Sequence, residues 1–292
     1  MVMHMNQRAQ FGPAGNSLSF EQRGYKSFAD VPKYVVEMGL DTFEYQCGRG
    51  VNIGKESAAK LGALAAEAGI TLSIHAPYYI SLSSKDEQKR HNSARYLLQS
   101  AAAARAMGAK RIVLHPGSAG GQDRGQALAL AQETLGYCLA RLDGAGYGDL
   151  IFCPETMGKL GQLGDLEEIM ELCRLDERLI PCIDFGHLNA RSQGGVKTTE
   201  DYAHIVDTVK NRLGAERGRM FHAHFSKIEY TAGGEKRHRT FEDTVFGPDP
   251  RPLMELVARR GLAPIFICES DGTQAEDAAA MKRMYDEALK KL

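Results

Sequence analysis

The sequence predicts a single (β/α)8 barrel, or TIM barrel, over residues 1–292. Eight short apolar segments alternate with helix-forming segments along the chain. The apolar segments are nearly continuous, which indicates parallel strands that are buried on both faces. No G-x-G-x-x-G motif follows the first of them, although such a motif would be usual in an open, doubly wound sheet. A chain of 292 residues is also an ordinary length for a barrel of this class.

The barrel requires eight strands, each followed by a helix. The expected strands are residues 10–15, 42–47, 70–75, 111–115, 150–155, 179–184, 220–225 and 264–269. The expected helices are, to within a few residues, 28–38, 55–68, 85–107, 126–142, 165–175, 199–213, 252–260 and 275–292. The polar, glycine-containing stretch 231–243 is expected to be a loop.

Composition narrows the function only slightly. The chain has 36 basic and 37 acidic residues, so bulk charge neither demands nor excludes a nucleic-acid partner. Its six cysteines form no C-x-x-C pair and fall mostly in apolar runs, which is typical of reduced, buried thiols in a cytoplasmic protein. No apolar run approaches the ~20 residues of a membrane span, and residues 1–6 show no secretion signal, so we expect no membrane partner.

Metal-binding side chains end six of the expected strands in succession. The active site of such a barrel is built where the strands end. The residues at these ends are His75, His115, Glu155, Asp184, His222 and Glu269. Two further imidazoles follow, His187 just after the sixth strand and His238 in the loop after the seventh. Imidazole and carboxylate together suit zinc, manganese or iron.

Each of these residues, taken alone, is more often structural than metal-binding. A histidine is commonly held by hydrogen bonds, and an acid after a strand commonly pairs with arginine or caps a helix. Six such residues at successive strand ends are harder to explain as structural residues, because unpaired acids would repel one another in a site of low dielectric constant. Six candidates also exceed the four ligands of one ion. We therefore expect a carboxylate that bridges two ions, an arrangement suited to displacement at phosphorus.

The chain resembles endonuclease IV, the zinc-dependent apurinic/apyrimidinic endonucleases, which are (β/α)8 barrels. The matching segments occur in family order over nearly the whole barrel. They are Ser73–Tyr78, Leu114–Ser118, Pro154–Thr156, Cys182–His187, Phe221–Lys227, Arg237–His238 and Cys268–Glu269.

The resemblance implies a site with two or three Zn2+ ions, with Mn2+ as another option. His75 and His115 would bind the first ion, and Glu155, the catalytic carboxylate, would bridge it to the second. Asp184, His222 and Glu269 would complete the second site, and His187 and His238 would bind the third. The implied reaction is hydrolysis 5′ to an abasic site in double-stranded DNA, by a monomeric enzyme. Tyr78 and Arg49 would enter the DNA beside the lesion.

Three stretches depart from the family pattern. The Asp-Arg-His-His motif is represented by residues 236–239, in which Lys236 replaces the aspartate ligand. Glu235, Glu229 or His224 could supply that ligand, or the third site could be weak or empty. In the seventh-strand motif, His224-Phe225 replaces the usual Asn-Asp. Ala76-Pro77 follows His75 where a polar pair is usual.

Two other functions remain open. A sugar isomerase or epimerase of the xylose-isomerase-like barrels would use Glu155, Asp184, His222 and Glu269 around one Mn2+ or Mg2+, with His75 and His115 on sugar hydroxyls. A non-catalytic nucleic-acid-binding barrel is the third class. The basic residues after the seventh strand would serve it as phosphate contacts, or they would form a solvated loop; they are Lys227, Lys236, Arg237 and Arg239.

Overall fold

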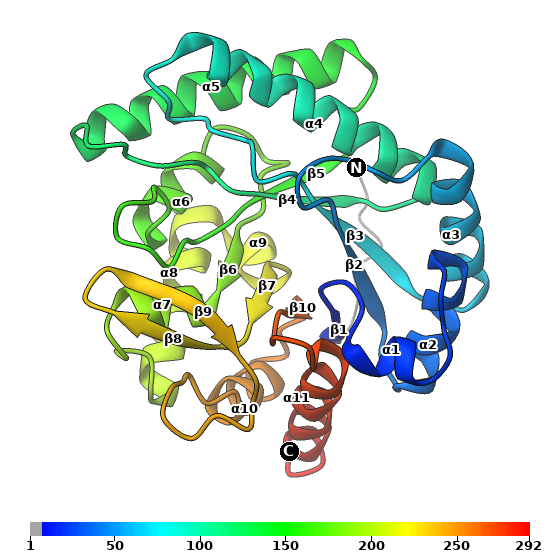
Figure 1. Ribbon diagram of the computed structural model, residues 1–292. Coiled ribbons are helices and arrows are strands. Elements are labelled where there is room, and N and C mark those ends of the chain that lie inside the picture. The colour runs from blue at the N-terminus through cyan, green and yellow to red at the C-terminus, as the bar shows by residue number, and fades with distance from the viewer. Residues whose placement is uncertain (1–7) are drawn as a thin grey trace.

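The computed structural model describes residues 8–292, so the first seven residues of the expected domain lie outside the described part. Eight parallel strands form the barrel wall, with helices around it (Figure 1). The strands are β1 (Gln10–Pro13), β2 (Thr42–Gln46), β3 (Thr71–His75), β4 (Arg111–Leu114), β5 (Ile151–Pro154), β6 (Cys182–Asp184), β7 (His222–Phe225) and β10 (Ile265–Cys268). The predicted fold class is therefore confirmed.

The wall consists of two parallel sheets joined at their edges. One sheet has the strand order β1-β10-β7-β6, and the other has the order β2-β3-β4-β5. A parallel bridge between Ala14 and Glu44 joins β1 to β2, and another between Glu155 and Cys182 joins β5 to β6. Closure brings the carboxyl ends of all eight strands to one mouth, where parallel barrels place their active sites.

Most of the helices form an outer ring around the strands. They are α1 (Leu18–Gln22), η1 (Phe28–Asp30), α2 (Val31–Glu37), α3 (Lys55–Glu67), α4 (Glu87–Met107), α5 (Arg124–Gly144), α6 (Leu166–Cys173), α7 (Phe185–Arg191), α8 (Thr199–Leu213), α9 (Ala215–Arg219), α10 (Arg251–Arg260) and α11 (Gln274–Leu289). Capping residues fix several ends: Asp165 and Thr198 form capping boxes at the starts of α6 and α8, and Gly108 ends α4 in the left-handed conformation.

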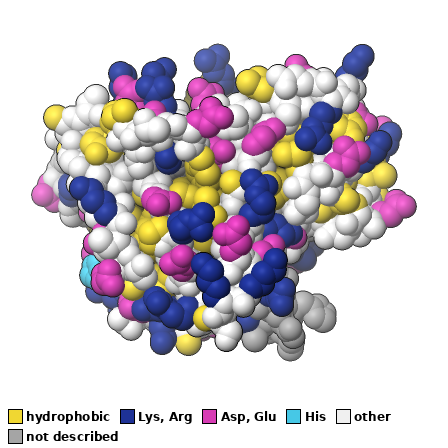
Figure 2. Space-filling view, turned by 90° about the horizontal axis from the view of Figure 1, so that it is seen from below, with side chains coloured by type: hydrophobic (Ala, Val, Ile, Leu, Met, Phe, Trp, Pro, Cys, Tyr) yellow, Lys and Arg dark blue, Asp and Glu magenta, His cyan; other side chains and the backbone are white. Residues whose placement is uncertain are grey.

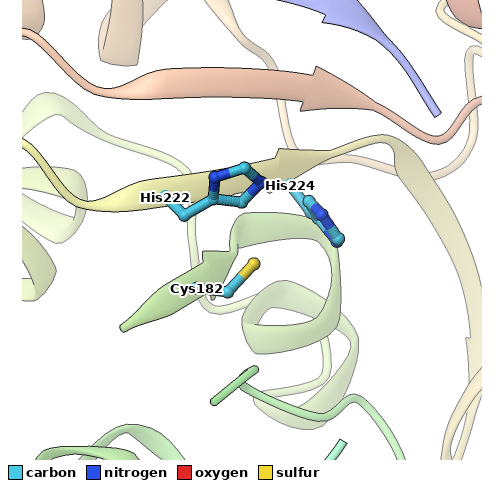
Figure 3. A group of neighbouring side chains, drawn as sticks. All are labelled: Cys182, His222 and His224. Atoms are coloured by element: carbon cyan, nitrogen blue, oxygen red, sulfur yellow. The ribbon is translucent and has the colours of Figure 1, made fainter. Parts of the chain in front are cut away.

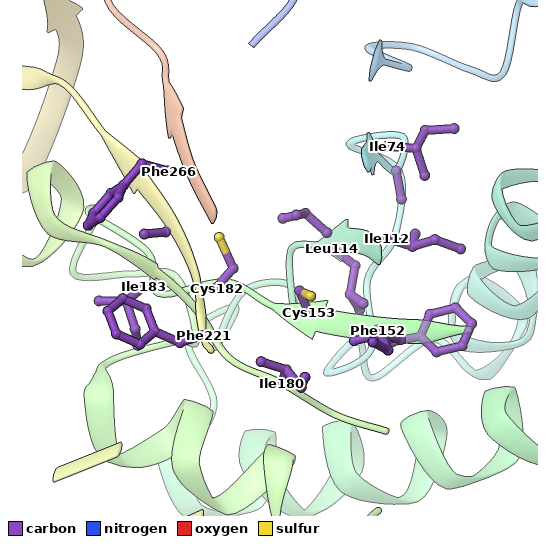
Figure 4. Close-up of a cluster of buried hydrophobic side chains, with 14 of the residues drawn as sticks. Ile74, Ile112, Leu114, Phe152, Cys153, Ile180, Cys182, Ile183, Phe221 and Phe266 are labelled. Atoms are coloured by element: carbon purple, nitrogen blue, oxygen red, sulfur yellow. The ribbon is translucent and has the colours of Figure 1, made fainter. Parts of the chain in front are cut away.

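Alternation along the strands separates an apolar outer layer from a polar interior. Phe221, the residue just before β7, packs toward Phe185 of α7, with ring centroids 6.4 Å apart, while His222 and His224 of β7 project into the barrel. Figure 4 shows part of this core, with Cys153 and Cys182 on neighbouring strands. All six cysteines are buried and free, which agrees with the thiols expected from the sequence. Because the polar residues of the strands project inward, polar side chains from different strands can meet inside the barrel.

The structure adds the short helices α1 and α9, which were not expected, and it differs from the prediction in two segments near the mouth. The expected loop 231–243 is largely an antiparallel hairpin, formed by β8 (Lys227–Thr231) and β9 (Gly234–Arg239). Helix α7 begins immediately after β6, so Asp184 is both the last residue of its strand and the N-cap of a helix. The side chain of Asp184 accepts a hydrogen bond from the backbone N–H of His187 at 2.6 Å. Both features place polar side chains at the mouth of the barrel, where His187 of α7 and Glu235 of β9 lie 3.3 Å apart.

The outer surface carries charges of both signs. Figure 2 shows acidic and basic side chains interspersed on one face of the molecule, in keeping with a formal net charge of −1. Among the helices of residues 8–292, none combines the length and the apolar character needed to cross a bilayer.

Gly12 lies where β1 approaches β2 most closely, and we expect Gly12→Ala to lower the free energy of unfolding by about 3 kcal/mol. A Cβ at this position would lie 1.9 Å from the carbonyl oxygen of Thr42, a backbone atom that cannot move without opening the wall. Guanidinium denaturation measures the effect. Gly136→Ala is the control, because Gly136 is exposed on α5 with open space around it and should gain about 0.5–1 kcal/mol. Equal stability of the two variants would contradict this view of barrel closure.

Candidate metal centre

Three groups of imidazoles and carboxylates meet at the mouth of the barrel. The first group is His75, His115 and Glu155. The second group is Glu155, Asp184, His224 and Glu269. The third group is His187, Glu235 and His238. Within each group, one candidate ligand atom from every residue lies within 4.8 Å of the others. All the predicted ligands except His222 fall in these groups, and their binding of metal stays a prediction.

Glu155 joins the first group to the second. Its Oε2 lies 3.2 Å from Nε2 of His75 and 3.2 Å from Nε2 of His115. Its Oε1 lies 3.3 Å from Nδ1 of His224 and 3.3 Å from Nδ1 of His187. The carboxylate is 1% exposed, and burial alone would raise its pKa. The surrounding imidazoles, chiefly His224 and His115, outweigh burial and hold the pKa well below its usual range.

The spacing of these atoms suits a bound cation. Ligands about 2.0–2.2 Å from a tetrahedral ion lie about 3.3 Å from one another. The contacts of Glu155 fall at this separation, and so does Nδ1 of His224, which lies 3.5 Å from Oε1 of Glu269. Charge-assisted hydrogen bonds are usually shorter, about 2.7–2.9 Å. In addition, Oδ2 of Asp184 is buried without a hydrogen bond among the described residues, and its ion-pair partner is Nδ1 of His187 at 3.4 Å. Buried acids of this kind are normally paired or bound to metal.

The second group contains His224 where the sequence predicted His222. Both side chains point into the barrel, because residues two apart lie on the same face of a strand, and their ring centroids are 5.4 Å apart. His222 lies deeper, and its Nε2 is 3.0 Å from Oε2 of Glu44. Its pKa is lowered to about 4, mainly by burial, so the ring is neutral. His222 therefore lies outside the three groups, although it could hold an ion together with Cys182 and His224, and its role as a metal ligand stays a prediction.

The third group brings Glu235, one of the residues that the sequence left open as a replacement ligand, next to His187 and His238. Oε2 of Glu235, on β9, lies 3.3 Å from Nε2 of His187. The other nitrogen of His187 is 2.9 Å from the carbonyl oxygen of Thr156, which orients the ring. Lys236 points elsewhere, because its ammonium pairs with Glu229 at 2.6 Å. Glu235 therefore stands where the family aspartate was expected, one residue before Lys236.

The basic residues of the hairpin are partnered within the chain. Lys236, Arg237 and Arg239 all form ion pairs with Glu229, and the first two are the main reason that its pKa is lowered to about 2. The ammonium of Lys227 donates to the carbonyl oxygen of Phe241 at 2.9 Å. The ion pairs of these basic residues with Glu229 thus link β9 to β8 and stabilise the hairpin.

The two residues expected to contact DNA lie on neighbouring loops at the mouth. The Tyr78 side chain is 57% exposed, and its ring centroid lies 5.9 Å from that of His75 and 5.7 Å from that of His115. The backbone N–H of Tyr78 donates to the carbonyl oxygen of Gly48 at 3.0 Å. This bond ties the loop after β3 to the loop that carries the exposed Arg49.

A buried acid that sequence reasoning missed lies beneath the second group. Glu44 is in the middle of β2, not at its end, and its side chain is fully buried inside the barrel. Burial would raise its pKa, but the nearby His224 and His222 hold the pKa well below its usual range. The available signal was the alternation of polar Thr42, Glu44 and Gln46 with the aromatic residues between them.

Asp184 would make metal binding at the second group sensitive to acid. Burial, with help from Glu269 and Glu155, raises its pKa from 3.8 to about 6, against the opposing effect of His187. In the metal-free protein, the contribution of this group to stability is full below pH 3.8 and is lost as pH rises through about 6. A bound cation requires the carboxylate form, so binding below about pH 6 must release a proton.

We therefore expect metal affinity of the second group to fall below about pH 6, with Asp184 adding one proton, or about tenfold per pH unit, to the dependence. Titration against a competing chelator between about pH 5 and 7.5 measures it. Asp184→Asn is the comparison, because it should bind more weakly throughout and lose one proton from the slope. Identical slopes for the two proteins would contradict the role of Asp184.

The fold and the three groups define a (β/α)8 barrel with side chains at its mouth that could hold metal ions. A family model described as the xylose isomerase-like TIM barrel matches residues 32–290, and the chain belongs to that family.

Curated relatives point in part to endonucleases. An uncharacterized protein of Methanocaldococcus jannaschii, MJ0133, is 31% identical over 95% of this chain and 97% of its own length. A probable endonuclease 4 of Mycoplasma pneumoniae is 32% identical over 66% of this chain and 65% of its own length.

Solved structures from both candidate classes are similar in fold to this chain. A D-tagatose 3-epimerase-like protein has a TM-score of 0.69 at 18% identity, covering 89% of this chain and 93% of its own. Endonuclease IV from Thermus thermophilus has a TM-score of 0.64 at 20% identity, covering 91% of this chain and 95% of its own. At such identities the likeness concerns the fold alone, so the choice between the classes depends on the site.

Proposed function

We propose that this protein is a zinc-dependent phosphodiesterase that hydrolyses double-stranded DNA 5′ to abasic sites. The observation that carries the proposal is the position of Glu155, which directs one oxygen to each of two imidazole-containing groups beside a third group. A site with three such groups exceeds what one ion requires. The relatives named endonuclease 4 support the same choice.

The donor sets fit zinc. His75, His115 and Glu155 would hold one ion, Glu155, Asp184, His224 and Glu269 a second, and His187, Glu235 and His238 a third. Ions of this kind, when bound, lower the pKa of water and neutralise the charge of a phosphate group. Nitrogen and oxygen ligands in sets of three or four are typical of zinc, although manganese accepts similar ligands.

The chain itself would bind and orient the DNA. Tyr78 presents an exposed ring beside the first group, where it can stack on the base next to the lesion. Arg49, on the adjoining loop, is a fixed positive charge within reach of the same strand. An abasic nucleotide costs little to extrude, because it has no base to unstack.

The test is cleavage of a duplex oligonucleotide that carries one stable abasic-site analogue. We expect chelator-sensitive nicking 5′ to the lesion, which leaves a 3′ hydroxyl, and no nicking of the intact duplex. Absence of cleavage by protein shown to contain its metals would overturn the proposal.

Tyr78→Ala should lower kcat/KM for abasic DNA by roughly 10–100-fold, because loss of one stacked base costs about 1–3 kcal/mol. Tyr79→Ala is a matched control, since Tyr79 is 52% exposed but packs on Tyr96, with ring centroids 5.8 Å apart. Steady-state nicking kinetics compare the two variants with wild type. Equal losses in both would show that the effect is general and not due to stacking beside the first group.

The alternative is a sugar epimerase, which the second group alone favours. Glu155, Asp184, His224 and Glu269 form a complete four-ligand set, the number that a single-metal isomerase would need. In that case His75 and His115 would be free to contact a sugar, whereas both here approach one oxygen of Glu155. Ketose epimerisation, assayed on the same metal-loaded preparation, decides between the two functions.

A further inference from the structure

Glu44 is the acid on which two imidazoles of β7 converge. Its Oε2 lies 3.0 Å from Nε2 of His222 and accepts from the hydroxyl of Ser73 at 2.8 Å. Its Oε1 accepts from Nε2 of Gln46 at 3.1 Å and lies 3.0 Å from Nε2 of His224. The side chain of Glu44 is fully buried, so these contacts are what compensate its removal from water.

His224 faces a carboxylate on each side of its ring. Nδ1 lies 3.3 Å from Glu155 and 3.5 Å from Glu269, both in the second group. Nε2 lies 3.0 Å from Oε1 of Glu44 but outside hydrogen-bond geometry, so it makes no hydrogen bond among the described residues, and the thiol of Cys182 is its other polar neighbour. A neutral imidazole donates from one nitrogen and offers a lone pair at the other. Metal-binding histidines usually donate their free N–H to a carboxylate, which fixes the tautomer and the ring orientation.

We propose that Glu44 is a positioning residue for the metal centre. The negative charge of Glu44, 3.0 Å from Nε2 of His224, favours the tautomer that carries its proton at Nε2, and this leaves the Nδ1 lone pair for the second group. Ser73, Gln46 and His222 hold the carboxylate in place from the other directions. The inference rests on the metal centre of the proposed function, but it concerns the architecture of the centre and not the reaction.

A second metal-binding arrangement would involve Cys182 and the same two histidines. Its thiol points toward the rings of His222 and His224, and the three residues together could hold an ion of their own (Figure 3). His224 would then have to bridge two ions through both ring nitrogens. Glu44 already provides a carboxylate 3.0 Å from Nε2 of each ring, so positioning requires no bridging imidazole. Cys182→Ala therefore separates the two uses.

The experiment measures zinc content and zinc affinity by competition with a chromophoric chelator. Glu44→Gln should weaken one zinc equivalent by about 10–100-fold and leave the others unchanged. Cys182→Ala should keep every equivalent at wild-type affinity. Wild-type affinity in Glu44→Gln, or loss of an equivalent in Cys182→Ala, would overturn the inference. Wild-type protein that binds no zinc would overturn the proposed function as well, so the two failures are distinguishable.

A measurement on the wild-type protein guards against a variant that does not fold. Nitrogen-15 NMR of labelled histidines in the zinc-loaded protein reports the tautomer of each ring, and the His224 signals are assigned by their loss in His224→Gln. We expect His224 to carry its proton at Nε2, protected from exchange, with Nδ1 bound to metal. A proton at Nδ1, or metal on both nitrogens, would overturn the inference.

Discussion

Glu155→Gln is expected to abolish nicking of abasic DNA, with a loss of roughly 10³-fold or more, and to remove zinc from two groups at once. Changes that only touch the partners of metal ligands cost about 10–100-fold, so losing a shared ligand must cost more. Oε2 of Glu155 approaches two imidazoles of the first group, and Oε1 approaches His224 of the second. A glutamine amide would present a donor to one of these groups, and it lacks the negative charge that balances the cations.

Elemental analysis and nicking kinetics on the same preparation measure both effects. Glu168→Gln is the control, because Glu168 is a buried glutamate that pairs with Arg124 beside α6, away from the three groups. It should lower stability while zinc content and activity per folded molecule stay unchanged. Full zinc content in Glu155→Gln would show that this carboxylate does not bridge two ions.

Substitution of the two histidines of β7 is expected to give the largest difference in zinc content and activity between two neighbouring positions. His224→Gln should lose one zinc equivalent and roughly 10²-fold or more in activity, because His224 belongs to the second group. His222→Gln should keep all its zinc, with activity within about tenfold of wild type, because His222 lies outside the three groups and its Nε2 faces the positioning acid Glu44. The two substitutions remove the same side chain from the same face of the same strand.

Zinc content and nicking rates of the two variants provide the comparison. Thermal unfolding of the metal-free variants separates structural loss from loss of metal. Loss of zinc in His222→Gln, with retention in His224→Gln, would contradict the structure and restore the assignment made from the sequence.

The barrel and most of its mouth were predictable because strand ends are marked in the sequence. An apolar run that ends in His115 or Glu155 gives both the strand and the position of the polar side chain. The register of His222 and His224 was not predictable, because residues two apart share a face and only depth along the barrel separates them. Glu44 was not predicted as part of the site because it lies within a strand, and only residues at strand ends were considered.

The third group could not be completed from sequence for a different reason. Glu235 and Lys236 are adjacent, and only the pairing of β8 with β9 decides which one faces His187. That register shifts at an irregularity between Glu229 and Tyr230, which a linear pattern does not reveal. Gly158 then lets the hairpin approach, since a Cβ there would lie 2.6 Å from Cβ of Glu235. Local composition indicated only a polar loop.

The most direct test of the central claim is the number of metal ions bound per chain, measured by elemental analysis of zinc-loaded wild type and of His187→Ala. Three side-chain groups at the mouth predict about three equivalents for wild type. His187→Ala should retain about two, because only the third group loses a ligand. One equivalent in wild type, unchanged in His187→Ala, would contradict a multinuclear centre and would favour the single-metal epimerase.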